Sequence, residues 1–275
     1  MPEVDEEDLT RKQRREQARE QRKAAEAAAT ADAARRRRLT QLAGVVAVVV
    51  VAIVVILIAS GGGSSSSGKP KPSEIPTIAK EVNAKLEGIP QSGRTIGSPT
   101  APVTMQYFGD LECPICKKFS DKEGALPALL AGPVKEGKLR IEYMNLQTAT
   151  RNPETFKTQQ KAALAAGAQK KGWNYIELFY NEQGQETTEY VNEAYLQGLA
   201  KQIPGLNLSQ WQSERGNPKF ESELQSDAQL SNNNGLTGTP SFLIGHSGGA
   251  LKTYEWSSLT DPKPFEEAIE KAAKA

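Results

Sequence analysis

The chain has two cysteines, Cys113 and Cys116, and only Pro114 and Ile115 separate them. Two thiols at this spacing can close a small disulfide ring, so the pair can alternate between a dithiol and a disulfide within one chain. A redox use of such a pair is favoured where a strand and a turn precede it and a helix begins at it. This feature constrains the fold more than any other in the sequence.

The residues around the pair match that context. Residues 103–108 are a short apolar run that predicts a strand, and residues 109–112 predict a turn. Pro114 suits the first position of a helix because its φ is fixed and it has no N–H to leave unpaired. Cys113 is then expected at the helix N-terminus, where free N–H groups and the helix dipole stabilise an anion such as a thiolate. We predict that Cys113 is the attacking thiol and that Cys116 is the more buried, resolving thiol.

The charged residues beside the pair act in opposite directions. Lys117 and Lys118 add positive charge after it, whereas Asp110 and Glu112 add negative charge before it. We expect the helix terminus to outweigh the two acids, so that the thiolate of the first cysteine is stabilised.

Two other uses of the pair compete with a redox role. A structural disulfide across so short a loop contributes little loop-closure stabilisation. Tetrahedral zinc needs four ligands, and the chain offers no third cysteine and one histidine, His246. His246 is expected in a surface turn rather than in a catalytic role. A redox-active pair therefore remains the favoured interpretation.

Residues 39–60 carry no charge, and their centre is almost entirely Val, Ile, Ala and Leu. Roughly 20 apolar residues are enough for a helix to cross a bilayer core of about 30 Å. Four arginines, residues 35–38, precede the segment and no comparable cluster follows it. This asymmetry predicts a cytoplasmic N-terminus and an extracytoplasmic C-terminal domain. A cleaved signal peptide is the alternative, but its apolar region is typically only about 7–15 residues long and begins near the N-terminus, so an uncleaved signal anchor is predicted.

The span divides the chain into four predicted parts. Residues 1–38 form a charged cytoplasmic tail, disordered or helical, and residues 61–75 form a Gly/Ser/Pro linker. Residues 76–275 are long enough to bury a core of their own. The formal net charge of +1 gives no electrostatic basis for binding a nucleic acid.

Periodicity within residues 76–275 predicts strands at both ends of a long helical stretch. The predicted strands are residues 103–108, 139–145, 241–244 and 251–256. The predicted helices are residues 75–86, 153–171, 174–181, 191–202, 209–215, 219–230 and 262–274, together with the helix that begins at Pro114. Gly124 and Pro127 are expected to bend or end that helix.

Two motifs resemble a known family. Residues 96–119 (IGSPTAPVTMQYFGDLECPICKKF) resemble the opening of a DsbA-like thioredoxin-fold domain, and residues 235–245 (GLTGTPSFLIG) resemble its closing motif. The resemblance implies an α/β thioredoxin fold with a helical insertion, about 148–235, between the second and third core strands. It also implies that Pro240 is a cis-proline facing the two cysteines and that Thr239 offers backbone hydrogen bonds to an extended substrate.

The sequence departs from that family at two places. Thioredoxin-like proteins often carry a buried acid six residues before the first cysteine, and here that residue is Tyr107. Its role is then vacant or supplied by another group, such as Asp110 or water. The pair encloses Pro114 and Ile115 rather than Pro-His, so one favourable contact to the thiolate is missing. A less stable thiolate makes the disulfide a milder oxidant than that of the extreme members.

The resemblance implies a thiol–disulfide oxidoreductase that oxidises client thiols through Cys113 and Cys116, and the apolar segment at residues 39–60 predicts that it is membrane-tethered and extracytoplasmic. No cofactor is expected, because the two sulfurs carry the electrons. The expected partners are client proteins with cysteine thiols, the bilayer around residues 39–60, and a membrane redox protein that regenerates the disulfide. Two alternatives stay open: a reductase or isomerase of the same fold, and a non-catalytic tethered chaperone or binding module.

Overall fold

The computed structural model describes residues 77–185 and 188–274. The predicted tail (1–38), membrane span (39–60) and linker (61–75) lie outside the described residues. Within 77–185 and 188–274, no helix is long and apolar enough to cross a membrane.

A six-stranded sheet organises the described residues, in the order β1-β2-β4-β3-β5-β6. β3 and β4 are parallel, as expected for strands joined by a helical crossover, and the other neighbours are antiparallel. The strands are β1 (Gln91–Ser92), β2 (Thr95–Ile96), β3 (Val103–Gly109), β4 (Leu139–Asn145), β5 (Ser241–His246) and β6 (Lys252–Tyr254).

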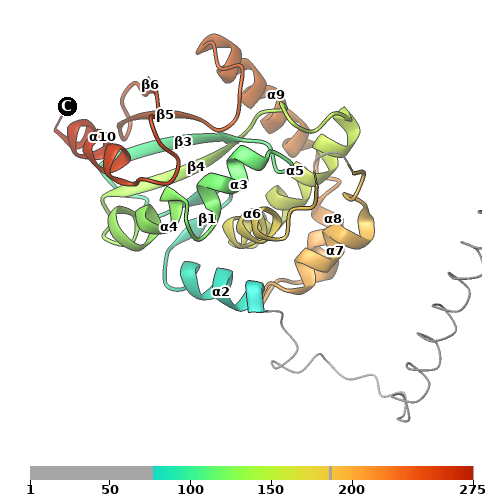
Figure 1. Ribbon diagram of the computed structural model, residues 1–275. Helices are drawn as coiled ribbons and strands as arrows, with labels where there is room; N and C mark the ends of the chain where they lie inside the picture. Colours follow the sequence, from blue (N-terminus) through green and yellow to red (C-terminus); the bar gives the residue numbers. More distant parts are fainter. Residues whose placement is uncertain (1–76, 186–187, 275) are drawn as a thin grey trace, which may run out of the picture. The chain divides into compact units, whose positions relative to one another are not determined.

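Helices fill the connections between the strands (Figure 1). The helix α2 (Thr77–Leu86) precedes the sheet, and α10 (Lys263–Ala273) follows it. Between β3 and β4 lie α3 (Pro114–Ser120), α4 (Ala125–Leu129) and a π-helical turn, η3 (Leu130–Val134). Between β4 and β5 lie α5 (Pro153–Ala168), α6 (Gly172–Asn181), α7 (Glu193–Lys201), α8 (Leu208–Glu214) and α9 (Pro218–Asn233). The chain thus forms a mixed α/β fold in which a helical segment separates the second long strand from the third.

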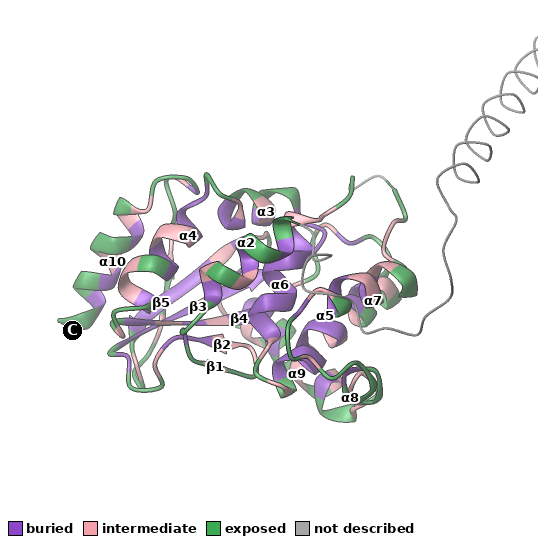
Figure 2. Ribbon diagram, turned by 90° about the horizontal axis from the view of Figure 1, so that it is seen from below, coloured by how far each residue is buried: buried purple, intermediate pink, exposed green. Residues whose placement is uncertain are grey.

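The two faces of the sheet differ in what covers them, because side chains alternate along each strand. Tyr107, Tyr143 and Phe242 project into the large core beneath α3, α6 and α10. Phe108 and Met144 point to the opposite face and form a smaller cluster against Leu230 of α9 and its neighbours. In Figure 2 the strands are largely purple while the outer sides of the helices are green, so the large core lies between the sheet and the helices.

The helical segment docks on the edge of the sheet through a close backbone contact. The turn at Gly93 joins β1 to β2, and a Cβ added at Gly167 of α5 or at Gly172 of α6 would lie 2.6 Å from the Gly93 carbonyl oxygen. Trp173 strengthens this contact, since its indole N–H donates to the carbonyl of Arg94 at 2.9 Å. The glycines therefore permit the approach that holds the helical segment on the sheet.

Most of the predicted helices and strands agree with the structure, and three features differ. The β1–β2 hairpin was not predicted, because strands of two residues have no measurable periodicity. His246 is exposed as predicted, but it is the last residue of β5 rather than part of a turn, because it still pairs with Val103. The predicted strand at 251–256 is shorter, covering Lys252–Tyr254.

Substitution of two helical glycines tests the docking contact. Gly167→Ala places a methyl group against the Gly93 backbone, so we expect a loss of about 1–3 kcal/mol in the free energy of unfolding. Gly198→Ala, within α7, has no atom within 4 Å of the new Cβ and is expected to gain about 0.5–1 kcal/mol. Urea denaturation of the purified proteins measures both. Equal effects of the two substitutions would contradict the contact.

Candidate active site

Cys113 lies at the junction of β3 and α3, as the sequence predicts. Pro114 is the first residue of α3, and Cys113 is its N-cap. The Cys113 sulfur takes the place of the usual capping oxygen, because it accepts a hydrogen bond from the Cys116 N–H at 3.3 Å. Both thiols are free in this structure.

The second predicted motif lies directly against the first. The Thr239–Pro240 peptide bond is cis, as predicted. The Cys113 thiol lies 3.3 Å from the Thr239 carbonyl oxygen and donates to it in its protonated form. The structure therefore brings together all four predicted site residues, although 126 positions separate Cys113 from Thr239.

The two thiols have opposite acidities. The pKa of Cys113 is lowered to about 6, chiefly by hydrogen bonding with the Cys116 thiol; Thr239 and the backbone N–H groups of Cys116 and Ile115 add to this, against the effect of burial. Burial raises the pKa of Cys116 well above its ordinary value. At neutral pH, Cys113 is therefore the thiolate and Cys116 the thiol, which is the predicted division between attacking and resolving cysteine.

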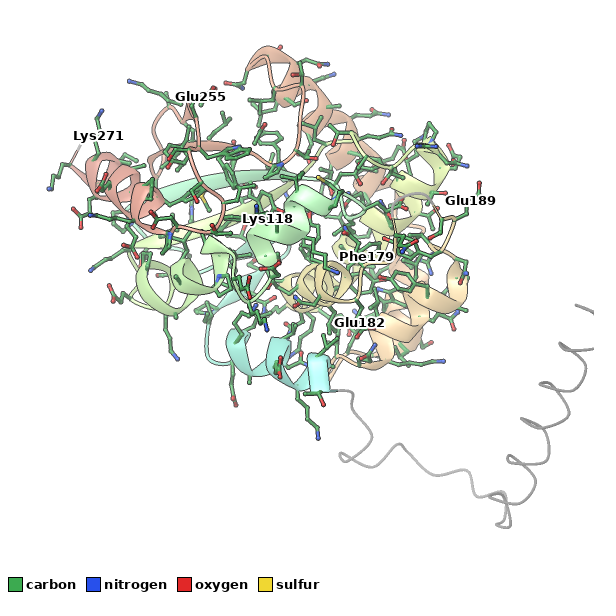
Figure 3. The ribbon with its side chains drawn as sticks, viewed as in Figure 1. Lys118, Phe179, Glu182, Glu189, Glu255 and Lys271 are labelled. Atoms are coloured by element: carbon green, nitrogen blue, oxygen red, sulfur yellow. The ribbon has the colours of Figure 1, made fainter. Side chains whose placement is uncertain are left out.

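The lysines after the pair do not account for this difference. Lys117 donates to the Gln183 carbonyl oxygen at 3.4 Å, and Lys118 is exposed on α3, where Figure 3 labels it. The largest lowering of the Cys113 pKa comes from the Cys116 thiol, and the backbone N–H groups at the start of α3 add less, so the helix terminus contributes to the lowering without dominating it as expected.

The side chain of Asp110 holds the loop after β4 next to the residues that precede Cys113. Its carboxylate is fully buried and accepts the N–H groups of Thr148, Ala149 and Thr150, each at 2.9 Å. The Thr148 hydroxyl in turn bonds to the Thr239 hydroxyl at 2.5 Å. Asp110 thus links the residues before Cys113 to the loop that supports the cis-proline. Its oxygens are committed to that loop, which argues against the predicted use of Asp110 as a proton-transfer group.

Sequence reasoning missed three residues that position the site. These are Thr148, Gln183 and Trp256. The Thr148 hydroxyl bonds to that of Thr239, and the Gln183 amide donates to the carbonyls of Leu111 (2.6 Å) and Cys113 (3.2 Å). The indole N–H of Trp256 donates to the Pro240 carbonyl at 3.1 Å. None of them lies in a motif or follows a periodic pattern. Their contacts arise only when the helical segment and the last strands fold back onto α3.

Apolar surface flanks the thiols. Ile115 is 45% exposed and Trp256 is 40% exposed, and both belong to the few large hydrophobic side chains on the surface of the described domain. An apolar surface of this kind suits contact with an unfolded polypeptide. Among residues 77–185 and 188–274, no group of three or more His, Cys, Asp or Glu side chains is arranged to hold a metal.

The acidity of Cys113 predicts the pH dependence of its reactivity. The rate of alkylation by iodoacetamide should rise through pH 6 and level off by about pH 8, because only the thiolate reacts. In Cys116→Ala the midpoint should move to higher pH, since the largest contribution that lowers the pKa is lost. Mass spectrometry of the labelled peptides measures the alkylation rate in both proteins. As a control, unfolding in urea should return the midpoint of the Cys113 pH profile to about 8.5. A folded-state midpoint above pH 8 would contradict the assignment.

Comparisons with known proteins agree with this geometry. The sequence model of a family described as Thioredoxin matches residues 90–262. The probable disulfide bond formation protein D of Bacillus anthracis is 23% identical over 172 residues, which cover 60% of this chain and 74% of that protein. The disulfide bond formation protein D of Bacillus subtilis is 24% identical over 184 residues, covering 65% and 76%.

Solved structures show the same fold. The oxidised BdbD of Bacillus subtilis superposes with a TM-score of 0.55 at 21% identity, covering 69% of this chain and 98% of that one. DsbA2 of Pseudomonas aeruginosa superposes with a TM-score of 0.50 at 21% identity, covering 68% and 98%. Because the family match covers more than half of the chain, the chain belongs to the thioredoxin family and has a DsbA-like fold around Cys113 and Cys116.

Proposed function

We propose that this thiol–disulfide oxidoreductase works in the oxidising direction and donates the Cys113–Cys116 disulfide to client thiols. The observation that carries the proposal is the position of the Cys113 sulfur, which caps α3 and lies against Cys116 and Thr239, so that its pKa is lowered to about 6. A stabilised thiolate favours the reduced form of the enzyme, and a stable reduced form makes the disulfide a stronger oxidant. The relatives named disulfide bond formation protein D support the same direction.

The geometry gives each residue a part in the exchange. A client thiolate attacks the Cys113 sulfur, which lies beside the exposed Ile115, and forms a mixed disulfide while Cys116 departs. A second client thiolate then attacks the client sulfur of the mixed disulfide, and Cys113 leaves as a stable thiolate. Thr239 and Pro240 face Cys113, where the backbone of an extended client segment would lie. The client gains one disulfide and the enzyme becomes a dithiol.

The location and the partner are part of the proposal. Residues 39–60 would anchor the protein in the cell membrane as a single span, with the N-terminus in the cytoplasm and the catalytic domain outside. A membrane redox protein would reoxidise the dithiol. A tether of about 15 residues would raise the local concentration of the domain at that partner.

Single-cysteine variants test the proposal. The oxidised protein should convert a reduced, unfolded client to its disulfide form with one client disulfide per enzyme molecule. Cys113→Ser and Cys116→Ser should each reduce this oxidation at least a hundredfold, since each removes one sulfur of the disulfide. His246→Ala, at the far end of β5 from the cis-proline, is the matched control and should leave the rate unchanged.

The readout is thiol titration of the client together with trapping of mixed disulfides. Cys116→Ala should accumulate a mixed disulfide through Cys113 with a disulfide-bearing client, and Cys113→Ala should not. If the dithiol form reduced clients while the disulfide form left reduced clients unchanged, the enzyme would be a reductase. If both cysteine variants kept full client binding and biological effect, the binding-module alternative would replace the proposal.

A further inference from the structure

The hydroxyl of Tyr107 is a buried donor without a hydrogen-bond partner among the described residues. Tyr107 lies on β3, and its side chain is fully buried. Its ring packs edge-on against Phe119 of α3 at 5.2 Å between centroids, and it stacks on Phe242 of β5 at 5.4 Å. Buried polar groups normally find a partner, so an unpaired one in a well-packed core calls for an explanation.

The ring contact places Tyr107 beneath the reactive helix. Cys116 and Phe119 are three residues apart on α3, and both face the core. Tyr107 therefore meets the face of α3 that carries the Cys116 sulfur. Burial raises the pKa of Tyr107, and the Cys116 sulfur raises it further through its charge and through hydrogen bonding, which also shows that the two groups are close.

The other polar groups at this place already have partners. The hydroxyls of Tyr143 and Tyr180 bond to each other at 3.0 Å, and the Tyr180 hydroxyl also donates to the Asp110 carbonyl at 3.3 Å. The Glu177 carboxylate forms an ion pair with Lys85 at 3.0 Å and accepts a hydrogen bond from the Ser120 hydroxyl. Tyr107 thus differs from Tyr143 and Tyr180 in that its hydroxyl makes no hydrogen bond of normal geometry in the dithiol form.

The exchange reaction creates an acceptor at this position. When a thiolate attacks Cys113, the bond between the two sulfurs breaks and its electron pair goes to Cys116. Cys116 is fully buried, where a negative charge is poorly solvated. In thiol–disulfide exchange the rate depends on how well the leaving sulfur carries that charge.

We propose that the Tyr107 hydroxyl donates a hydrogen bond to the Cys116 sulfur as it leaves as a thiolate, and so supplies in this chain the stabilisation that lowers the barrier to exchange. The inference rests on the proposed function only in that Cys113 and Cys116 form the exchanging disulfide.

Atoms and electrons balance without proton loss from the tyrosine. The attacking thiolate forms a new bond to Cys113, the Cys113–Cys116 bond breaks, and Cys116 becomes a thiolate that Tyr107 stabilises. The second attacking thiol releases its proton, and this proton neutralises Cys116 by way of solvent. The client is oxidised by two electrons and the enzyme disulfide is reduced by two.

Tyr107→Phe isolates the hydroxyl, because it keeps the ring and its aromatic contacts. The full-length oxidised protein is mixed with reduced glutathione, and the reverse exchange is followed with oxidised glutathione, both by stopped-flow tryptophan fluorescence. We expect both rates to fall about tenfold to a hundredfold, as for loss of a hydrogen bond to a charged group. The reduction potential should change far less than the rates, because the hydroxyl makes no hydrogen bond of normal geometry in the dithiol and acts mainly on the charge that develops during exchange. The stability of the reduced protein should be equal or higher, since no hydrogen bond is lost.

Tyr175→Phe is the matched control. Its hydroxyl is also fully buried, but it donates to the Leu196 carbonyl at 3.1 Å, so the variant should lose stability while its exchange rate stays that of the unsubstituted protein. Unchanged rates in Tyr107→Phe would overturn the proposal. So would a rate change matched by a shift in potential, about 30 mV for each tenfold, because the hydroxyl would then act on a stable redox state. These rates are measured with glutathione instead of a client protein. An enzyme that failed to oxidise clients would therefore overturn the proposed function, while the effect of Tyr107→Phe on the exchange rate would still test the role of the hydroxyl.

Discussion

The contact on which the site depends is the hydrogen bond from the Cys116 N–H to the Cys113 sulfur at the start of α3. It makes a side-chain sulfur the cap of a helix, and the helix N-terminus favours the anionic form of that cap. The same contact fixes the sulfur against Thr239. The position of Cys113 between β3 and Pro114 therefore sets the geometry of the nucleophile and adds to its acidity, for which the neighbouring Cys116 thiol is the largest cause.

The rest of the fold holds this junction in place. The buried Asp110 carboxylate accepts hydrogen bonds from N–H groups of the loop after β4. That loop contacts Thr239 through the Thr148 hydroxyl. Gln183, which follows α6 within the helical segment, donates to the carbonyl of Cys113. The helical segment thus contributes to the positioning of the nucleophile, although it carries neither cysteine. Its own position depends on the close approach of Gly167 to the Gly93 turn.

Folding separates the acidities of two thiols that would be nearly equal in an unfolded chain. The pKa of Cys113 is lowered to about 6, so its ionisation stabilises the folded dithiol fully above the pKa of an unfolded thiol, and this contribution is lost as pH falls through 6. Cys116 is stable as a thiol, because burial raises its pKa. Neutral pH lies in the range where Cys113 is anionic and Cys116 is not. An anionic Cys113 is a good leaving group for the client, and it favours transfer of the disulfide away from the enzyme.

The sequence predicted the parts of this arrangement that depend on local rules. A short apolar run identified β3, alternation of apolar and polar residues identified β4, Pro114 identified the start of α3, and the two motifs identified the four site residues. The β1–β2 hairpin lacked any periodic signal, and the contacts of Asp110, Thr148 and Gln183 join segments 38 to 91 positions apart, which no local pattern reports. The departure at Tyr107 was visible in the sequence, but its unpaired hydroxyl beneath α3 became apparent only once Phe119 and Phe242 were packed around the ring.

The most direct test of the oxidising role is the equilibrium reduction potential of the Cys113–Cys116 pair in the purified protein, titrated against glutathione with thiol trapping as the readout. A thiolate stabilised as in this structure predicts a value between about −120 and −180 mV, the range of strong protein oxidants and disulfide isomerases. Because Pro114 and Ile115 offer no histidine to the thiolate, we expect the milder part of that range. A value near about −270 mV, as in thioredoxin, would contradict the account and assign the protein to disulfide reduction.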